Sequence, residues 1–258
     1  MGKTEIEWTD KAWNPVTGCT GISPGCANCY ASRMAKRLAG RFGYPADDPF
    51  RVTVHKDKLS EPLCWRKPAR IFVCSIGDLF HENVPPNVID GVFAVMDVAR
   101  RHTFQLLTKR PANMAKYVRD WLRRRQSIYP LRNVWLGVTA EDQQRADERI
   151  PDLLDTPAAV RFVSVEPMLG PVDLRNWLGK PTVRRMDRES GAGCGFLDWV
   201  ICGAETGPGA RPMDNQWAAD LCRQCQEADV PFFFKKHSDG SRRLMGREWN
   251  QMPGQKNH

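Results

Sequence analysis

The sequence predicts an α/β barrel of parallel strands, and three observations support this fold class. Short apolar runs recur along the chain, as expected for strands that are covered on both faces. Segments with a helical pattern alternate with these runs, which is typical of parallel βα units. The length of 258 residues suits one barrel domain spanning 1–258. The predicted strands are Ile71–Cys74, Phe104–Leu107, Val134–Val138, Val160–Val165, Trp199–Cys202 and Pro231–Phe234.

The intervening helices are predicted from their ends and their apolar faces. We expect them at Cys29–Leu38, Pro86–Arg101, Pro111–Arg125 and Asp214–Ala228, with one further short strand before Cys19. Two stretches interrupt the alternation, residues 40–68 and residues 179–195. We interpret both as excursions from the barrel rather than as separate domains.

Composition indicates a protein of the cytoplasm that does not enter a membrane. No apolar run approaches the roughly 18 to 20 residues of a membrane span, and the first ten residues do not resemble a signal peptide. Nine cysteines are an odd number, which favours ligands or core residues over a disulfide framework. The net charge of +8 predicts a nucleic-acid partner. The basic clusters at 119–125, 184–188 and 235–247 could equally be solvated helix faces.

Polar side chains follow the predicted strands, where the loops of a parallel barrel converge on one mouth. A helix N-cap is an alternative role for several of them, notably Ser75, Asp78 and Thr139. Glu166 and Glu205 are harder to explain in that way, because a carboxylate directly after a buried strand needs a partner or a ligand. The candidate residues are Ser75, Asp78, Lys109, Thr139, Glu141, Glu166, Glu205 and His237.

Three cysteines, Cys19, Cys26 and Cys29, lie within eleven residues on a glycine-rich loop directly before a predicted helix. Thiolates on such a loop select an iron–sulfur cluster, zinc or copper. Structural zinc normally has four ligands, and no fourth ligand lies at the usual spacing. Three ligands that leave one position open favour a metal centre that binds a small molecule. The distant pair Cys222 and Cys225 is interpreted as core packing.

Seven segments between Thr9 and Lys236 carry a family resemblance. They are TDKAWNPVTGCTGISPGCANCYA, IFVCSIGDLFHENVP, FQLLTKRP, NVWLGVTAED, FVSVEPMLGP, WVICGAETGPGARP and VPFFFKK. With them the chain resembles the phage and bacterial three-cysteine-motif family, which is related to the radical S-adenosylmethionine enzymes. The resemblance implies a partial (β/α)6-7 barrel, TIM-like and of the radical S-adenosylmethionine type. The spacing here is CX6CX2C, whereas the familiar pattern of those enzymes is CX3CX2C with an aromatic residue before the last cysteine.

The same resemblance implies two cofactors. Cys19, Cys26 and Cys29 would hold a [4Fe–4S] cluster, whose unique iron would bind the amino and carboxylate groups of S-adenosylmethionine. An electron would cleave that molecule to methionine and a 5′-deoxyadenosyl radical, and the radical would abstract hydrogen from a substrate. An electron donor such as flavodoxin or ferredoxin is therefore an implied partner.

Further cofactor contacts are placed by strand order. By position, Ser75 and Asp78 resemble the segment that holds the methionyl amino group. Contacts with the ribose or the adenine are expected from Thr139, Glu141 and Glu166.

Three residues are candidates for catalysis. Lys109 could meet either a DNA phosphate or a substrate carboxylate. Glu205 and His237 could hold or move protons.

Charge and resemblance together suggest modified thymine in phage DNA as the substrate. The hypothesis is an isomerisation that moves a glycyl adduct of thymidine from an N-linked to a C-linked form, in the host cytoplasm, so that the genome evades restriction. The target base would be flipped out of the duplex. Three alternatives remain open: a radical enzyme acting on another nucleic-acid base, a zinc-holding module that binds nucleic acid, and an inactive or electron-transferring cluster protein.

Overall fold

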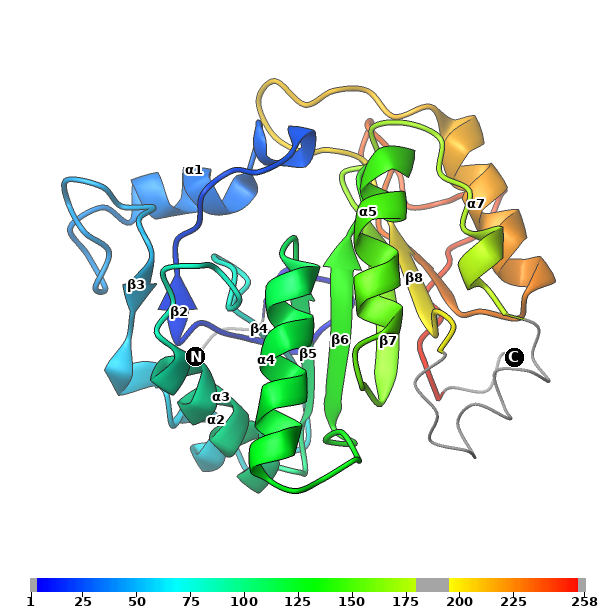
Figure 1. The fold of residues 1–258 in the computed structure, drawn as a ribbon. Coiled ribbons are helices and arrows are strands. Elements are labelled where there is room, and N and C mark those ends of the chain that lie inside the picture. Colours follow the sequence, from blue (N-terminus) through cyan, green and yellow to red (C-terminus); the bar gives the residue numbers. More distant parts are fainter. Residues whose placement is uncertain (1–3, 180–194, 255–258) are drawn as a thin grey trace.

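A computed structural model describes residues 4–179 and 195–254, and its centre is a curled sheet of seven parallel strands (Figure 1). The strand order along the sheet is the order along the chain, so each connection leads to the next position and the sheet curls into a half-barrel. The α/β class and the parallel sheet predicted from sequence are confirmed. The strands are β1 (Lys11–Trp13), β4 (Arg70–Val73), β5 (Thr103–Thr108), β6 (Val134–Thr139), β7 (Val160–Val165), β8 (Trp199–Cys202) and β9 (Phe232–Phe234).

All six predicted strands are present, and β1 is the additional strand expected before Cys19. A small antiparallel sheet of β2 (Val16–Thr17) and β3 (Thr53–Val54) was not predicted. It joins the start of the cysteine loop to the excursion at residues 40–68. Two residues per strand give no alternation that a sequence pattern could reveal.

The helices follow the predicted positions with one omission. The predicted helices are observed as α1 (Tyr30–Arg37), α3 (Pro86–Val98), α4 (Pro111–Arg124) and α7 (Asn215–Glu227). The missed helix is α5 (Gln143–Leu154), which is rich in charge and contains Pro151. Its start is fixed by Asp142, whose side chain accepts a hydrogen bond from the Arg145 amide. The short elements are α2 (Glu61–Cys64), η1 (Pro24–Cys26), η2 (Lys56–Lys58) and η3 (Arg175–Trp177).

The helix α3 ends at Val98, before the predicted end at Arg101. Ala99 leaves the helical conformation, and its carbonyl accepts a hydrogen bond from the His102 amide at 3.0 Å. This turn leads directly into β5, so the tertiary connection ends the helix although the sequence pattern continues.

The two faces of the sheet bury different sets of side chains. Alternate strand residues such as Ile71, Phe104 and Val163 pack with the helices in the larger core. The opposite, inner face packs a smaller cluster of mainly aromatic residues. Gly137 on this face gives room to the ring of Phe162, since an added Cβ would lie 2.5 Å from that ring. The inner cluster is Trp8, Phe72, Phe162, Trp199, Ile201, Phe233 and Met252.

The two predicted excursions are described to different extents. Residues 40–68 leave the alternation and contain β3, η2 and α2. Most of the stretch at 179–195 falls on residues 180–194, outside the described residues, together with the basic cluster at 184–188. Within the described ranges, no helix has the length and apolar character needed to cross a membrane.

Candidate functional site

A cavity of about 910 Å³ opens at the carboxyl ends of the parallel strands. Its volume lies in the range of pockets that bind small molecules and cofactors. The wall brings together all three loop cysteines and six of the eight strand-end candidates, so the convergence predicted from sequence is largely observed. The principal polar and thiol groups in the wall are Cys19, Cys26, Cys29, Ser75, Asp78, Lys109, Thr139, Ser164, Glu166, Glu205 and Lys235.

The cysteine loop leaves β2 through Gly18, where a close approach of the backbone requires glycine. Gly18 has a φ of +85°, and an added Cβ would lie 2.1 Å from the Arg51 carbonyl oxygen. Its amide donates to the Ile76 carbonyl at 2.8 Å, which ties the loop to the end of β4. The loop ends where Cys29 caps α1. All three thiols are half-buried and form no disulfide.

Two carboxylates hold the middle of this loop against the barrel. Glu141, after β6, accepts a hydrogen bond from the Gly25 amide at 3.0 Å and forms a buried ion pair with Arg149 at 2.9 Å. Glu205, after β8, accepts from the Asn28 side-chain amide at 2.9 Å. The loop is therefore positioned by two strand ends as well as by its own turns.

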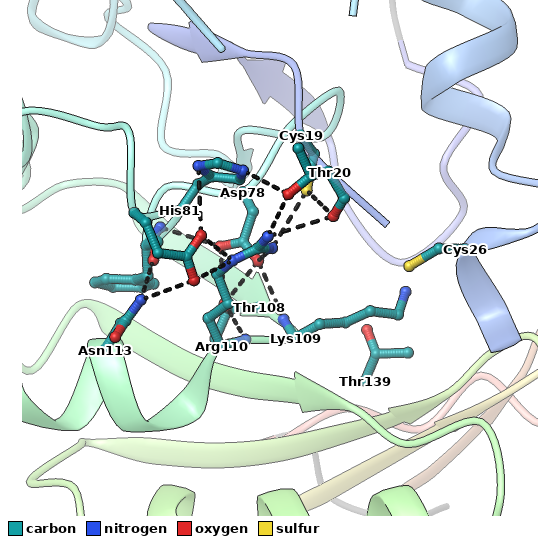
Figure 2. A network of polar contacts seen from close by, with 12 residues as sticks. Cys19, Thr20, Cys26, Asp78, His81, Thr108, Lys109, Arg110, Asn113 and Thr139 are labelled. Carbon is teal, nitrogen blue, oxygen red and sulfur yellow. Dashed lines mark hydrogen bonds and ion pairs between the residues drawn. The ribbon is translucent and has the colours of Figure 1, made fainter. Parts of the chain in front are cut away.

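Arg110 fixes the first part of the loop through a network of charged contacts (Figure 2). Its Nε donates to both carboxylate oxygens of Glu82 at 2.9 Å, and its Nη1 lies 3.4 Å from Asp78. The same guanidinium donates to the Thr20 hydroxyl at 2.9 Å and to the Cys19 sulfur at 3.4 Å. Because Arg110 is held by two carboxylates, it presents a fixed donor to Cys19.

The two cysteines at the ends of the CX6C segment have different electrostatic surroundings. Burial and the Asp78 charge raise the pKa of Cys19 to about 11, despite the nearby Arg110. Burial also acts to raise the pKa of Cys26, but the Lys109 ammonium and hydrogen bonds within the loop bring it below its usual value. Figure 2 shows the Lys109 side chain extending from the end of β5 toward Cys26. Two successive residues thus direct positive charge at two different thiols.

One family model spans residues 3–254. It describes DUF5131, a protein of unknown function. The chain belongs to this DUF5131 family. No curated protein and no solved structure matches the chain. The family description names no activity.

The three thiols share one cavity without being assembled as a metal site. Within residues 4–179 and 195–254, no group of three cysteine, histidine or carboxylate side chains converges closely enough to hold a metal ion. The donor set still suits an iron–sulfur cluster, because three free thiols of one loop face a cavity with space for a second ligand. Ligation requires side chains of the loop to turn toward a common centre.

Glu141 does not face the cavity, contrary to the predicted contact with ribose or adenine. Its side chain is fully buried behind the loop, where Gly25 and Arg149 take its oxygens. Burial alone would raise the pKa of this carboxyl. The Ser23 hydrogen bond and the Arg149 charge lower it by more, so the net pKa is below its usual value and the carboxylate remains ionised. The structure gives Glu141 a role in holding the loop.

Glu205 and His237 are poorly placed for the predicted proton transfers. Hydrogen bonds from Arg211 dominate the surroundings of Glu205 and lower its pKa to about 2, so the carboxylate stays charged near neutral pH. His237 lies outside the cavity wall, with its ring 4.5 Å from that of Phe234. Its Nε2 donates to the Arg243 carbonyl at 2.9 Å. Both side chains thus have structural partners, and Glu205 also lies in the cavity wall.

Ser75 and Asp78 reach the cavity wall but already have protein partners. The Ser75 hydroxyl donates to the Asn14 side chain at 3.1 Å. Asp78 accepts from the Thr108 hydroxyl at 2.8 Å and from the Lys109 amide at 3.2 Å, in addition to Arg110. Asp78 is therefore the centre of a buried network, and a cofactor would have to share it.

Ser164 and Lys235 of the wall belong to the polar strand ends of the sequence but were given no role there. Ser164 lies between Phe162 and Glu166 on the inner face of β7, and alternation along that strand could have identified it. Lys235 follows the inner residue Phe233 by two positions, and its ammonium lies 2.5 Å from Glu166. This ion pair explains how Glu166 is tolerated directly after a buried strand.

The basic cluster at 119–125 lies on α4, away from the cavity wall. Four of its arginines pair with aspartates, as in Arg124 with Asp90 at 2.5 Å and Arg125 with Asp97 at 2.5 Å. The solvated helix face considered from the sequence is the better explanation of this cluster. The other two pairs are Arg119 with Asp155 and Arg123 with Asp120.

Proposed function

We propose that the chain is a radical S-adenosylmethionine enzyme with a partial TIM-like barrel of that type. The observation that carries the proposal is one cavity lined both by three free thiols of a single loop and by the polar ends of successive parallel strands. In this proposal Cys19, Cys26 and Cys29 hold a [4Fe–4S] cluster. The volume of about 910 Å³ accommodates a nucleoside-sized ligand beside it.

When held by these cysteines, the cluster would supply the electron for reductive cleavage of S-adenosylmethionine, with flavodoxin or ferredoxin as the class of electron donor. The chain's own residues position and shield the site. Arg110 and Lys109 place positive charge beside thiolates that would otherwise repel one another. Glu141 and Glu205 hold the loop from behind. The inner aromatic cluster closes the opposite half of the barrel to solvent.

For the substrate we propose a modified thymine of phage DNA, isomerised from an N-linked to a C-linked glycyl adduct during hypermodification that evades restriction. The net charge of +8 supports a polyanionic partner, and the sequence resemblance supports the phage setting and the host cytoplasm. A cavity of this size at the barrel mouth suits a single extruded base rather than an intact duplex.

Anaerobic reconstitution with iron and sulfide tests the proposal. The reduced protein is mixed with S-adenosylmethionine, and 5′-deoxyadenosine release is measured with and without thymine-modified DNA. The Cys26→Ser variant should lose both iron and cleavage. The matched control is Cys64→Ser, because Cys64 is an exposed free thiol outside the cavity wall. A protein that binds zinc, takes up no cluster and releases no 5′-deoxyadenosine would instead be a nucleic-acid-binding module.

A further inference from the structure

The ends of β5, β6 and β7 place three polar side chains in one row across the cavity wall. In the sheet register Thr108 pairs with Val138, and Thr139 pairs with Ser164. One residue further along β5, Lys109 is level with Thr139. Neighbouring strands lie about 4.8 Å apart, so the row of Lys109, Thr139 and Ser164 spans about 10 Å. All three residues line the cavity.

In the part of the chain that the structure describes, the side chains of this row make no hydrogen bond or ion pair, although the Lys109 charge acts on the Cys26 thiol and on the Glu141 carboxyl. The two hydroxyl residues are nevertheless deeply placed, with exposures of 4% for Thr139 and 2% for Ser164. Neither hydroxyl oxygen is among the fully buried side-chain atoms that lack a partner, so both are open to the cavity. Figure 2 shows the Lys109 side chain passing Thr139, with no interaction drawn to its ammonium. The row is therefore a set of donors directed at the cavity.

Charge defines the class of group that would complete the row. Two other cations of the wall are already neutralised, since Arg110 pairs with Asp78 and Glu82 and Lys235 pairs with Glu166, whereas Lys236 lines the same cavity. Among the described residues Lys109 forms no ion pair with a carboxylate, although its charge contributes to the lowered pKa of Glu141. One ammonium with two hydroxyl donors matches a singly charged group that has two accepting oxygens. The depth of the hydroxyls favours the terminal group of a ligand over the continuous backbone of a polymer.

We propose that Lys109, Thr139 and Ser164 form a binding site for the carboxylate of the substrate. The identity of the ligand rests on the proposed function: the resemblance implies that the iron would bind the carboxylate of S-adenosylmethionine, which would leave this row for the glycyl carboxylate of the modified thymine. Lys109 supplies the charge, and the two hydroxyls orient the oxygens.

The test compares two probes on the apoprotein: a thymidine carrying N-linked glycine on its 5-methylene group, and the corresponding primary amide. Calorimetric titration should show the acid binding at least about tenfold more tightly than the amide, as expected for one charge-assisted contact. Lys109→Met should abolish this preference, so that the acid and the amide bind with equal affinity. The matched control Lys116→Met, at an exposed position on α4, should keep it. Ser164→Ala and Thr139→Val should each reduce the preference by a smaller factor.

Equal affinity of the wild-type chain for acid and amide, no binding of either probe, or a preference that survives Lys109→Met would overturn the proposal. A second arm uses S-adenosylmethionine and its methyl ester. If only S-adenosylmethionine bound more tightly than its ester, and Lys109→Met removed that preference, the assignment of the site to the substrate would be overturned. These titrations need no cluster, so their outcome is separate from a failure to release 5′-deoxyadenosine, which tests the proposed function.

Discussion

The inner face of the half-barrel is a hydrophobic core over the first half of the strands and a polar cavity over the second. Along β7 the change takes four residues, from Phe162, which has no exposed surface, through Ser164 to Glu166. Along β9 it takes two residues, from Phe233 to Lys235. The same backbone alternation serves both layers. Burial in one layer therefore holds the strands together, while the next layer is free for chemistry.

Two residues that lie outside the strands, one near the start and one near the end of the described chain, complete the hydrophobic layer. Trp8 and Met252 pack into the inner core, with the Trp8 ring 4.6 Å from that of Phe72. At the carboxyl ends of the strands, the cysteine loop borders the interior and leaves it open as a cavity. Substitutions in the two layers should therefore differ in kind.

The largest effect is expected from Phe162→Ala in the inner core. Phe162 is fully buried and contacts Trp199 at a ring distance of 5.5 Å, so its truncation leaves a cavity. We expect a loss of about 3 to 5 kcal/mol in the free energy of unfolding. Urea denaturation measures it, with Ser164→Ala as the comparison in the polar layer at below about 1 kcal/mol. Similar losses for the two variants would refute the division into layers.

The next effect is expected from Arg110→Gln. This substitution leaves the buried carboxylate of Asp78 without its cation, and removing one partner of a buried pair costs about 3 to 5 kcal/mol. Partial exposure of the Glu82 side chain and the hydrogen bonds from Thr108 place the loss near the lower end. Chemical denaturation gives the value.

Arg125→Gln is the matched control for Arg110→Gln, because Arg125 pairs with Asp97 on the helical surface. We expect a change of at most about 1 kcal/mol there. If Arg110→Gln and Arg125→Gln had the same free energy of unfolding, the network around Arg110 would not be a rigid support for the cysteine loop.

A smaller effect is expected from Gly137→Ala, which adds a methyl group to the inner face of β6. The added Cβ would lie 2.5 Å from the Phe162 ring, and a ring held in a packed cluster can move little. We expect a destabilisation of about 1 to 3 kcal/mol, measured as a lower urea midpoint. The double variant Gly137→Ala with Phe162→Leu should recover part of the loss relative to Phe162→Leu alone. If the two changes in the free energy of unfolding were strictly additive, the residues at positions 137 and 162 would not be in contact.

The smallest effect is a pH dependence from Glu205. Its pKa is about 2 in the folded chain, below the ordinary 4.5, so the carboxylate stabilises the fold when ionised. That contribution is complete above about pH 4.5 and is lost as the pH falls toward 2. The wild-type chain should therefore exceed Glu205→Gln in stability at neutral pH, and the difference should shrink across this window. Thermal unfolding at several pH values measures it, and a constant difference would contradict the assignment.

The fold was largely predictable because the buried strands have continuous apolar runs, whereas α5 was missed because its sequence is charged and contains Pro151. That omission affected the site as well. The partner of Glu141 is Arg149 on α5, so the residue looked like an unpaired carboxylate in the sequence. Glu205 forms an ion pair with Arg211, six residues later on an irregular loop. A contact within such a loop has no periodicity from which it could be predicted. The cysteines needed no such information, since their spacing within one loop places them together.

The central claim is that the three loop cysteines hold a cluster with an open iron in this cavity. Low-temperature electron paramagnetic resonance of the reconstituted, dithionite-reduced protein tests it most directly, with spectra recorded before and after addition of S-adenosylmethionine. The proposal predicts a [4Fe–4S]⁺ signal that changes when S-adenosylmethionine binds and that is absent from Cys26→Ser but retained in Cys64→Ser. A protein without this signal, or with a signal that S-adenosylmethionine leaves unchanged, would contradict the proposal.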